Sequence, residues 1–157
     1  MASSVYIETT IVSYLTARPS RDLVQRAHQH LTRRWWRTRR PQFDLYVSPP
    51  VIQEARGGDS RRAQKRLAVL KGIPLLEPTP EAMRLASALV GAGTVPGQAA
   101  MDATHIAIAT AHGVGYLLTW NCAHIANAAM RSSIERICRE AGYEPPTLCT
   151  PEELMEE

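Results

Sequence analysis

The sequence predicts an α/β fold in which helices cover both faces of a parallel sheet. Short stretches rich in β-branched and aromatic residues alternate along the chain with longer segments of helical periodicity. Gly and Pro separate these segments every ten to twenty residues, without an internal repeat. A chain of 157 residues, 45% of them hydrophobic, is long enough for one well-packed domain and too short for two ordinary ones. We therefore expect residues 1–157 to form a single domain.

In the first half of the chain, each predicted boundary has a local cause. Pro19 and Pro41 end two helices because proline cannot continue helical hydrogen bonding. Ser48 suits the N-cap of a helix whose first turn contains proline, and Gly57 and Gly72 end helices. The predicted elements are strands at residues 3–7, 43–47 and 73–76, helices at residues 10–17, 22–40 and 61–71, and a short helix that carries Glu54.

The second half contains an alanine-rich helix followed by a short apolar strand. Thr79 or Pro80 begins a helix that runs to about residue 90, and a loop follows over residues 91–97. The alanine-rich helix over residues 98–112 ends at Gly113, and residues 116–119 form a buried strand. A helix over residues 129–141 and a last short strand over residues 147–149 complete the pattern.

Composition indicates a cytoplasmic protein. The longest mainly apolar stretch, residues 99–111, contains Asp102 and falls short of the ~20 apolar residues that a membrane span needs. The N-terminus shows no basic region followed by an apolar segment, the pattern of a secretory signal. Cys122, Cys138 and Cys149 are widely spaced and form no C-x-x-C pair, which fits a reducing compartment and offers no zinc or disulfide framework.

Positive charge is concentrated in one part of the chain. The net charge is only +3, but residues 18–71 hold 14 of the 18 Lys and Arg and four of the 15 acids. The rest of the chain is acidic. Such an asymmetry predicts a surface that faces a polyanion.

Four polar side chains fall near the carboxyl ends of predicted strands, where open α/β sheets bind ligands. Glu8 follows the first strand, Glu54 lies in the helix after the second, and Asn121 follows the strand at residues 116–119. Asp102 lies near the start of an otherwise small and apolar helix, where an unpaired charge is costly to bury. Mg²⁺ and Mn²⁺ are bound by such oxygen ligands. The alternatives are that Glu8 pairs with an arginine and that Asp102 caps its helix.

Four segments in this order resemble the PIN-domain ribonucleases, and most closely the VapC-like toxins of toxin–antitoxin pairs. The segments are YIETTIVSYL (residues 6–15), VIQEA (residues 51–55), MDATHIAIA (residues 101–109) and LLTWNCAHI (residues 117–125). The resemblance spans nearly the whole chain. It implies a PIN-like three-layer α/β/α sandwich with a roughly five-stranded parallel sheet, and metal-dependent endonucleolytic cleavage of RNA.

The resemblance assigns the catalytic and metal-binding roles to Glu8, Glu54, Asp102 and Asn121. Glu8 stands where the family usually has an aspartate, and Asn121 stands where an aspartate commonly follows the threonine. The longer side chain at position 8 shifts the metal or the strand end, and the amide at position 121 leaves three carboxylates instead of four. We expect one tightly held Mg²⁺ or Mn²⁺, a weak second site, and weakened or altered activity as a possible consequence.

The implied reaction is phosphodiester hydrolysis by a water that the metal activates, without a side-chain nucleophile. Glu8 and Asp102 are the first choices for direct metal contact. Glu54 binds the metal directly or through water and assists as base, and Asn121 orients a metal-bound water. Around them, Thr9, Thr10 and Thr119 either hydrogen-bond the carboxylates or simply cap their elements.

The segment RRWWRTRR mixes guanidinium groups with indoles, a combination that binds phosphates and stacks on bases. Its arginines either contact RNA or form a solvated face, while Trp35 is expected in the core. These candidate nucleic-acid contacts are Arg33, Arg34, Arg37, Arg39 and Arg40. The basic run over residues 61–71 is a solvated surface or a partner contact. A packed histidine is the favoured interpretation of His105, and contact with a substrate phosphate or a hydrogen bond to an acid is the alternative. His124 is interpreted as stabilising a turn or lying at the rim of the site.

Two functions follow from this pattern. The first is a Mg²⁺-dependent endoribonuclease toxin, neutralised by a small VapB-like antitoxin and paired as a homodimer, with the apolar helix around residues 85–90 as one dimer face. The second is a catalytically weak PIN-fold module that binds or regulates RNA, which the amide at position 121 favours. A nucleotide-cofactor enzyme is disfavoured because no G-x-G-x-x-G or G-x-x-x-x-G-K follows the first strand.

Overall fold

A four-stranded parallel sheet lies at the centre of the chain, in a computed structural model that describes residues 2–155. The sheet order is β2-β1-β3-β4, and all three pairings are parallel. From β1 the chain crosses to β2 on one side and later to β3 on the other, so the connections reverse direction between β1 and β3. The strands are β1 (Ser3–Ile7), β2 (Phe43–Tyr46), β3 (Tyr116–Leu118) and β4 (Thr147–Cys149).

The α/β class is confirmed, but the described sheet has four strands and not five. The segment at residues 73–76, expected to be a strand, makes a single parallel bridge between Val47 and Leu75. The amide of Val47 donates to Pro74 O at 3.0 Å, and the amide of Leu76 donates to Val47 O at 2.8 Å. The ladder stops there because Pro74 has no N–H to donate and because the chain after Val47 turns into a helix at Pro49.

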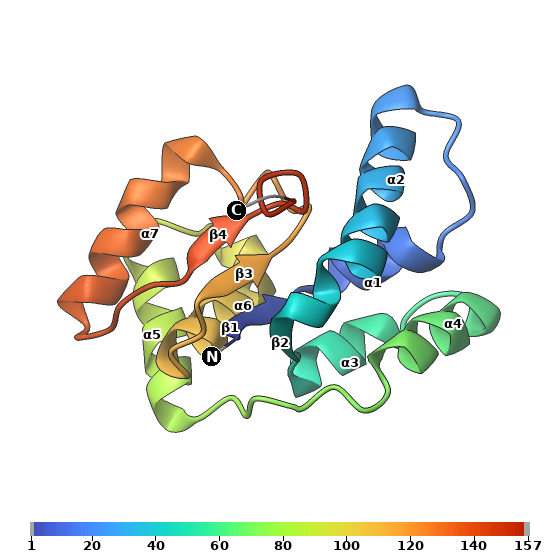
Figure 1. Ribbon diagram of the computed structural model, residues 1–157. Coiled ribbons are helices and arrows are strands. Elements are labelled where there is room, and N and C mark those ends of the chain that lie inside the picture. The colour runs from blue at the N-terminus through green and yellow to red at the C-terminus, as the bar shows by residue number, and fades with distance from the viewer. Residues whose placement is uncertain (1, 156–157) are drawn as a thin grey trace.

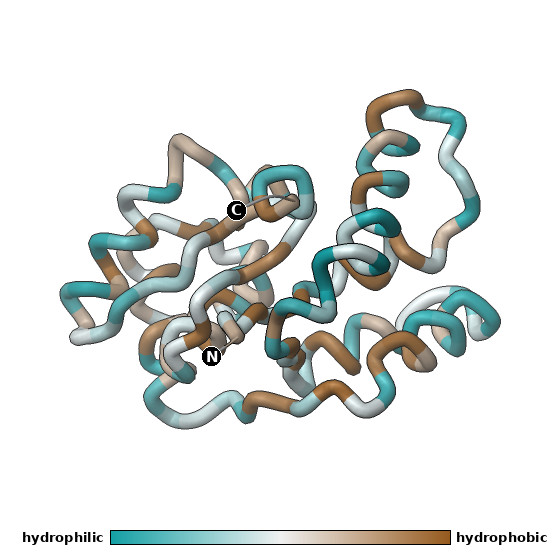
Figure 2. The backbone as a smooth tube through the Cα atoms, viewed as in Figure 1, coloured by the Kyte–Doolittle hydropathy of each residue, from teal (hydrophilic) through white to brown (hydrophobic). Residues whose placement is uncertain are grey.

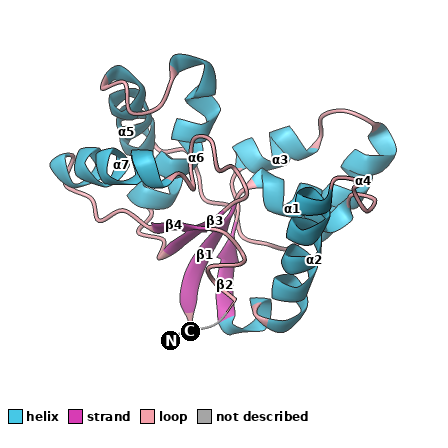
Figure 3. Ribbon diagram, turned by 90° about the horizontal axis from the view of Figure 1, so that it is seen from above, coloured by secondary structure: helices cyan, strands magenta, loops and turns pink. Residues whose placement is uncertain are grey.

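Helices cover both sides of the sheet, as the sequence predicted (Figures 1 and 3). Figure 3 shows α5, α6 and α7 grouped on one side and α1 to α4 on the other. This arrangement gives the expected three layers. The α-helices are α1 (Thr9–Thr16), α2 (Leu23–Thr38), α3 (Pro49–Ala55), α4 (Ser60–Leu70), α5 (Pro80–Gly91), α6 (Ala100–Ala111) and α7 (Ala128–Glu140); short 3₁₀ turns span Arg40–Gln42 and Gly97–Ala99.

Side chains at the helix N-termini set most of these boundaries. Asp22, Ser48, Asp59 and Thr79 each accept a hydrogen bond from the amide three residues later, as an N-cap does. Helix α2 ends at Thr38, two residues earlier than predicted, because the chain tightens into the 3₁₀ turn that contains Pro41. The predicted starts and ends of the helices alike lie within two residues of the observed ones.

The core fills the space between the sheet and both helical layers. The last three residues of β1 and the last two of β3 are fully buried, and Trp35 of α2 is buried as predicted. Figure 2 shows hydrophobic residues along the central strands. Leu85 and Leu89 of α5 are also buried within the chain, so they are not available to a dimer face. The exposed apolar side chains include Leu23, at 81% exposure, at the start of α2.

The three cysteines are free thiols with different accessibility, which predicts a labelling order. Cys122 is exposed, whereas Cys138 and Cys149 are buried. Burial, assisted by the charge of Glu153, raises the pKa of Cys149 to about 12. A raised pKa leaves less thiolate at a given pH, so the buried thiol reacts more slowly. The contribution of the neutral Cys149 thiol to stability is complete below the unfolded pKa near 9.0 and is lost as the pH rises towards 12.

At pH 8 an alkylating reagent is therefore expected to modify Cys122 in the folded protein well before Cys149. Peptide mapping by mass spectrometry measures the order, with protein unfolded in urea as the control in which all three react. Equal labelling rates of Cys122 and Cys149 in the folded protein would contradict the buried position of Cys149.

Candidate active site

The connections reverse direction at the gap between β1 and β3, and polar residues follow both strands there. The amide of Glu8 donates to Leu118 O at 3.1 Å, which extends the pairing of β1 and β3 by one residue. The Thr119 hydroxyl then donates to Glu8 Oε1 at 2.5 Å. Ligands bind at such a switch point in open α/β sheets, because the two crossovers leave a crevice between them. The carboxylate of Glu8 therefore lies where the fold leaves room for a ligand.

Within residues 2–155, Glu8 is a buried carboxylate without a Lys or Arg partner. Its exposure is only 3%, and its side chain serves as the N-cap of α1. Oε1 accepts three hydrogen bonds, from the Thr10 amide at 3.2 Å, the Thr10 hydroxyl at 2.5 Å and the Thr119 hydroxyl. Within residues 2–155, no Lys or Arg forms an ion pair with Glu8, and Oε2 accepts no hydrogen bond. A carboxylate buried in this way is costly unless a cation compensates it.

Glu54 reaches the same place from α3, the helix after β2. Its Oε1 accepts a hydrogen bond from the Thr9 hydroxyl at 2.6 Å and lies 2.6 Å from His105 Nε2. The Glu54 side chain is one-third exposed, at 34%. Partial burial on its own would raise the pKa of Glu54, but the hydrogen bond and charge of His105 and the hydrogen bond of Thr9 outweigh it, so the pKa is lowered. Glu54 is thus held as a carboxylate at neutral pH.

A buried hydrogen-bond chain extends from His105 away from the acids. His105 has no exposed surface, and its Nδ1 lies 2.6 Å from the Tyr6 hydroxyl. The same hydroxyl lies 2.6 Å from Ser48 Oγ, which also accepts from the Val51 amide. Burial raises the pKa of Tyr6 far above its usual range, so the hydroxyl stays neutral. The chain fixes the orientation of the His105 ring.

The donor set of these three residues fits a divalent ion. One ligand atom each from Glu8, Glu54 and His105 lies within 4.8 Å of the other two. Ligands on opposite sides of an octahedral ion are about 4.2 Å apart, so the group has nearly the size of a coordination sphere. Two carboxylates and one imidazole are common ligands of Mn²⁺ and related ions. The fit rests on this chemistry and on the uncompensated charge of Glu8.

Asp102 lies outside that three-residue group. It is in the first turn of α6, half-buried, and its Oδ2 lies 3.1 Å from His124 Nδ1. The pairing brings the loop after β3 against α6. Of the two alternatives for Asp102 that the sequence left open, helix capping is not the observed one, because α6 has no side-chain cap bond at its N-terminus.

Asn121 belongs to the turn after β3 and connects to Glu8 through Thr119. Its amide donates to Thr119 Oγ1 at 2.9 Å, and its Oδ1 accepts from the His124 amide at 3.0 Å. His124 therefore stabilises the turn and also contacts Asp102. The structure brings Glu8 and Glu54 together directly, while Asp102 and Asn121 are linked to each other through His124 on the β3 side.

The three threonines expected around the acids hydrogen-bond both carboxylates. Thr9 donates to Glu54, and both Thr10 and Thr119 donate to Glu8. Thr10 Oγ1 also accepts from the Trp120 amide at 2.8 Å, which ties the β3 end to α1. The threonines therefore orient the acids as well as end their elements.

The basic segment over residues 33–40 extends away from these acids. Its N-terminal neighbour Thr32 bonds the Trp120 ring nitrogen at 2.6 Å, but Arg33 bonds Ala17 O and Arg40 stacks over Trp36. Arg40 precedes β2, whose first residue pairs with Ser3, five residues before Glu8. At about 3.3 Å per residue, the start of β2, which follows Arg40, is roughly 16 Å from Glu8 along the strands. Arg34 and Arg37 are exposed on α2.

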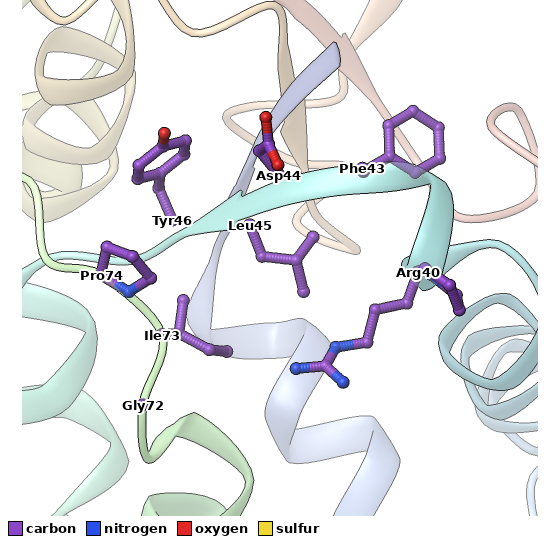
Figure 4. A pocket seen from close by; sticks show the side chains of 9 residues that line it. Arg40, Phe43, Asp44, Leu45, Tyr46, Gly72, Ile73 and Pro74 are labelled. Atoms are coloured by element: carbon purple, nitrogen blue, oxygen red, sulfur yellow. The ribbon is translucent and has the colours of Figure 1, made fainter. Parts of the chain in front are cut away.

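A shallow pocket lies beside the edge strand β2, apart from the acids. Figure 4 shows Arg40 reaching under β2 towards Leu45 and Ile73. The pocket has a volume of about 340 Å³, and Asp44 is the acid that lines it. A second cleft, of about 320 Å³, lies between the end of α1 and the start of α4. Its basic lining consists of Arg18, Arg61, Arg62 and Lys65, beside Asp59.

The alternative that His105 hydrogen-bonds an acid is the observed one, but sequence reasoning did not include His105 among the possible metal ligands. The histidine is packed, as expected, but its Nε2 faces Glu54 and completes the group with Glu8. One signal was available. His105 lies three residues after Asp102 on an apolar helix, where a buried polar ring needs partners. Those partners are Glu54 and Tyr6, which are separated from His105 by 51 and 99 positions in the sequence, so no local pattern reveals them.

Solved structures of low sequence identity share this fold. VapBC2 from Rickettsia felis, bound to a DNA fragment from its promoter, aligns with a TM-score of 0.59 and 14% identity over 94% of this chain and 98% of that chain. VapC20 from Mycobacterium tuberculosis, a sarcin-ricin loop cleaving toxin, aligns with a TM-score of 0.55 and 16% identity over 82% of this chain and 94% of that chain. No protein-family model and no curated protein matches the sequence. The fold is that of VapC-like PIN-domain proteins.

The helices of the described part of the chain, residues 2–155, are too short or too polar to cross a membrane.

Proposed function

From this VapC-like fold, we propose that the chain is a metal-dependent endoribonuclease, the toxin of a toxin–antitoxin pair, acting as a single domain over residues 1–157. The buried Glu8 carboxylate carries the proposal, because it lies at the switch point with three hydrogen-bond donors on one oxygen and, within residues 2–155, no Lys or Arg paired with it. Glu54, held ionised beside it, adds a second negative charge. Such a pair favours a divalent cation.

In this proposal Glu8 and Glu54 hold Mg²⁺ or Mn²⁺, and Asp102 and Asn121 complete the site on the β3 side. When bound, the ion supplies Lewis-acid activation of water and stabilises charge on the phosphate oxygens. Glu54 accepts the proton of the attacking water, since its carboxylate is ionised and partly exposed. Asp102 and Asn121 orient the water and the phosphate. The threonines keep the carboxylate oxygens in place.

Basic side chains near α1 support a polyanionic substrate. The cleft lined by Arg18, Arg61, Arg62 and Lys65 lies at the end of α1, the helix that begins beside Glu8. The eight residues of α1 span about 12 Å, so a strand cleaved at Glu8 has phosphates within reach of this cleft. We propose that RNA crosses this cleft and that the arginines of residues 33–40 contact more distant nucleotides.

The partners remain part of the proposal. A small VapB-like antitoxin is expected to neutralise the protein in the cytoplasm. We propose a homodimer through the exposed side of α5 and α6, where Met83 and Met101 are 43% and 38% exposed, instead of through Leu85 and Leu89. A shallow groove lined by Met83, Val90 and Thr104 lies on that side.

A catalytically weak RNA-binding module is the second candidate, and the turn after β3 favours it. Asn121 offers an amide in place of an acid, and its oxygen is already bonded to the His124 amide. Asp102 is likewise paired with His124. In that function the fold and the basic cleft suffice, and no phosphodiester bond is broken.

Purified protein is expected to cleave structured RNA in Mg²⁺ or Mn²⁺ and to lose this activity in EDTA. Because both acids are assigned to the site, Glu54→Gln and Asp102→Asn should each lower the cleavage rate at least about tenfold. Asp44→Asn, which removes an exposed acid on β2, is the matched control and should cleave normally. Gel analysis of end-labelled RNA measures the rates.

Two results would separate the candidates. Cleavage that persists in EDTA and in both site variants would contradict the site. RNA binding by gel shift without cleavage in either metal would support the second candidate instead.

A further inference from the structure

His105 presents a ring nitrogen to the two carboxylates. Nε2 lies 2.6 Å from Glu54 Oε1, and His105 belongs to the group of possible ligand residues that includes Glu8. Neighbouring ligands of an octahedral ion lie about 3 Å apart, so Nε2 and Oε1 need to separate by only a few tenths of an ångström to bind one ion. The ring is fully buried on α6 and is held in place from its other side.

We propose that His105 binds the metal ion through Nε2 and that the resulting nitrogen–oxygen site selects a first-row transition ion, such as Mn²⁺, over Mg²⁺. The inference rests on the proposed function only in placing an ion between Glu8 and Glu54. Mg²⁺ prefers oxygen ligands and retains its waters, whereas imidazole suits the transition ions. One nitrogen among three protein ligands therefore weakens Mg²⁺ relative to Mn²⁺.

The buried chain behind His105 supplies the support that a metal-binding histidine needs. A ligating Nε2 requires its proton on Nδ1, and a partner there fixes the ring. Nδ1 lies 2.6 Å from the Tyr6 hydroxyl, which can accept this proton in a hydrogen bond and donate its own to Ser48 Oγ. Without metal these hydrogen bonds have the opposite direction: Tyr6 donates to Nδ1, and Nε2–H donates to Glu54. Both directions satisfy every ring nitrogen.

The competing role for His105 is to orient Glu54 by a hydrogen bond alone. In that role the ring stays protonated on Nε2 and never contacts an ion. Metal preference then follows from oxygen ligands only. The two roles differ in one observable, the direct contact between an imidazole nitrogen and the ion, which is measured without RNA and without catalysis.

The decisive experiment uses the wild-type protein with Mn²⁺ alone. Electron spin-echo envelope modulation of bound Mn²⁺ is expected to show ¹⁴N coupling from one directly bound imidazole. Calorimetric titration is expected to give a dissociation constant for Mn²⁺ at least tenfold below that for Mg²⁺. Bound Mn²⁺ without nitrogen coupling would overturn the proposal, and so would the absence of any Mn²⁺ binding.

Two variants and a control test the assignment to His105. His105→Asn is expected to abolish the nitrogen coupling and to bring the Mn²⁺ and Mg²⁺ dissociation constants within about threefold of each other. Tyr6→Phe keeps Nε2 but removes the partner of Nδ1, so Mn²⁺ binding should weaken about 10- to 100-fold with the coupling retained. His30→Asn, on the exposed face of α2, should change neither. Coupling that survives in a folded His105→Asn variant would assign the nitrogen to another residue.

These measurements separate this inference from the proposed nuclease function. Nitrogen coupling in a protein that cleaves no RNA would support the metal site and contradict the nuclease. RNA cleavage by a protein whose bound Mn²⁺ shows no nitrogen coupling would support the nuclease and contradict the role of His105 as a metal ligand.

Discussion

Glu8→Gln is expected to lower RNA cleavage at least about 100-fold and, in EDTA, to raise the free energy of unfolding by roughly 1 kcal/mol or more. Glutamine has nearly the same shape, and its amide oxygen can accept the bonds from Thr10 and Thr119. The substitution removes a carboxylate that is 3% exposed and has no cationic partner within residues 2–155. Activity and stability thus change in opposite directions.

A divalent ion is expected to reverse this order of stability. At about 100 times the dissociation constant, an ion that binds only the folded protein adds roughly 2.7 kcal/mol. The wild type gains this and Glu8→Gln does not, so the wild type becomes the more stable protein in Mn²⁺ and the less stable one in EDTA. Urea unfolding followed by circular dichroism in the two buffers measures both values.

Glu140→Gln is the matched control for this substitution. Glu140 is an exposed acid on α7 that pairs with Arg136 four residues earlier. Exposed pairs of this kind contribute little, so the control should leave both activity and stability near the wild type. A Glu8→Gln protein that cleaves RNA normally, or that is less stable than the wild type in EDTA, would contradict the role given to Glu8.

The elements were predictable because their signals are local. Val5, Tyr6 and Ile7 read as a buried strand, and the strand is observed at Ser3–Ile7 as predicted. Ser48 and the prolines after it predicted the start of α3. The segment at residues 73–76 has the apolar pattern of a strand, but Pro74 and the early turn of the chain after Val47 limit it to one bridge. Apolar pattern shows which residues are buried and leaves open whether enough backbone groups can pair.

The site was predictable only in part, for a related reason. The rule that ligands bind at the carboxyl ends of parallel strands led to Glu8 and Glu54, which the structure places side by side. Asp102 follows a loop and a 3₁₀ turn, not a strand, and its partner His124 lies 22 residues away. The sequence did not show that His105 belongs to the site, because the partners of a buried histidine are known only from the fold. Pairing across the fold decides which polar residues share a site.

Trp35→Ala is expected to destabilise the protein by about 3–5 kcal/mol, the range for truncating a fully buried tryptophan. Trp35 has no exposed surface and stacks on Phe43 of β2 with ring centroids 5.7 Å apart. Its ring nitrogen also donates to Leu154 O at 3.2 Å, so the alanine variant leaves a cavity and an unpaired carbonyl. Folded domains have a stability of about 5–15 kcal/mol, so this one change removes much of it.

The loss of stability in Trp35→Ala should also affect the candidate site, because α2 carries Trp35 and also contacts the residues next to the site. Three residues before Trp35 on α2, Thr32 accepts a hydrogen bond from the Trp120 ring at 2.6 Å, and Trp120 follows the Thr119 that bonds Glu8. Trp35→Ala is therefore expected to weaken Mn²⁺ binding as well as folding.

Trp35→Phe keeps an aromatic ring and loses only the hydrogen bond to Leu154, so it should cost about 1–2 kcal/mol and stay measurable if the alanine variant does not fold. Trp36→Ala, at a partly exposed neighbour, is the matched control and should cost less than Trp35→Ala. Urea midpoints at an unchanged m-value would establish the order, and a Trp35→Ala protein within 1 kcal/mol of the wild type would show that α2 is anchored elsewhere.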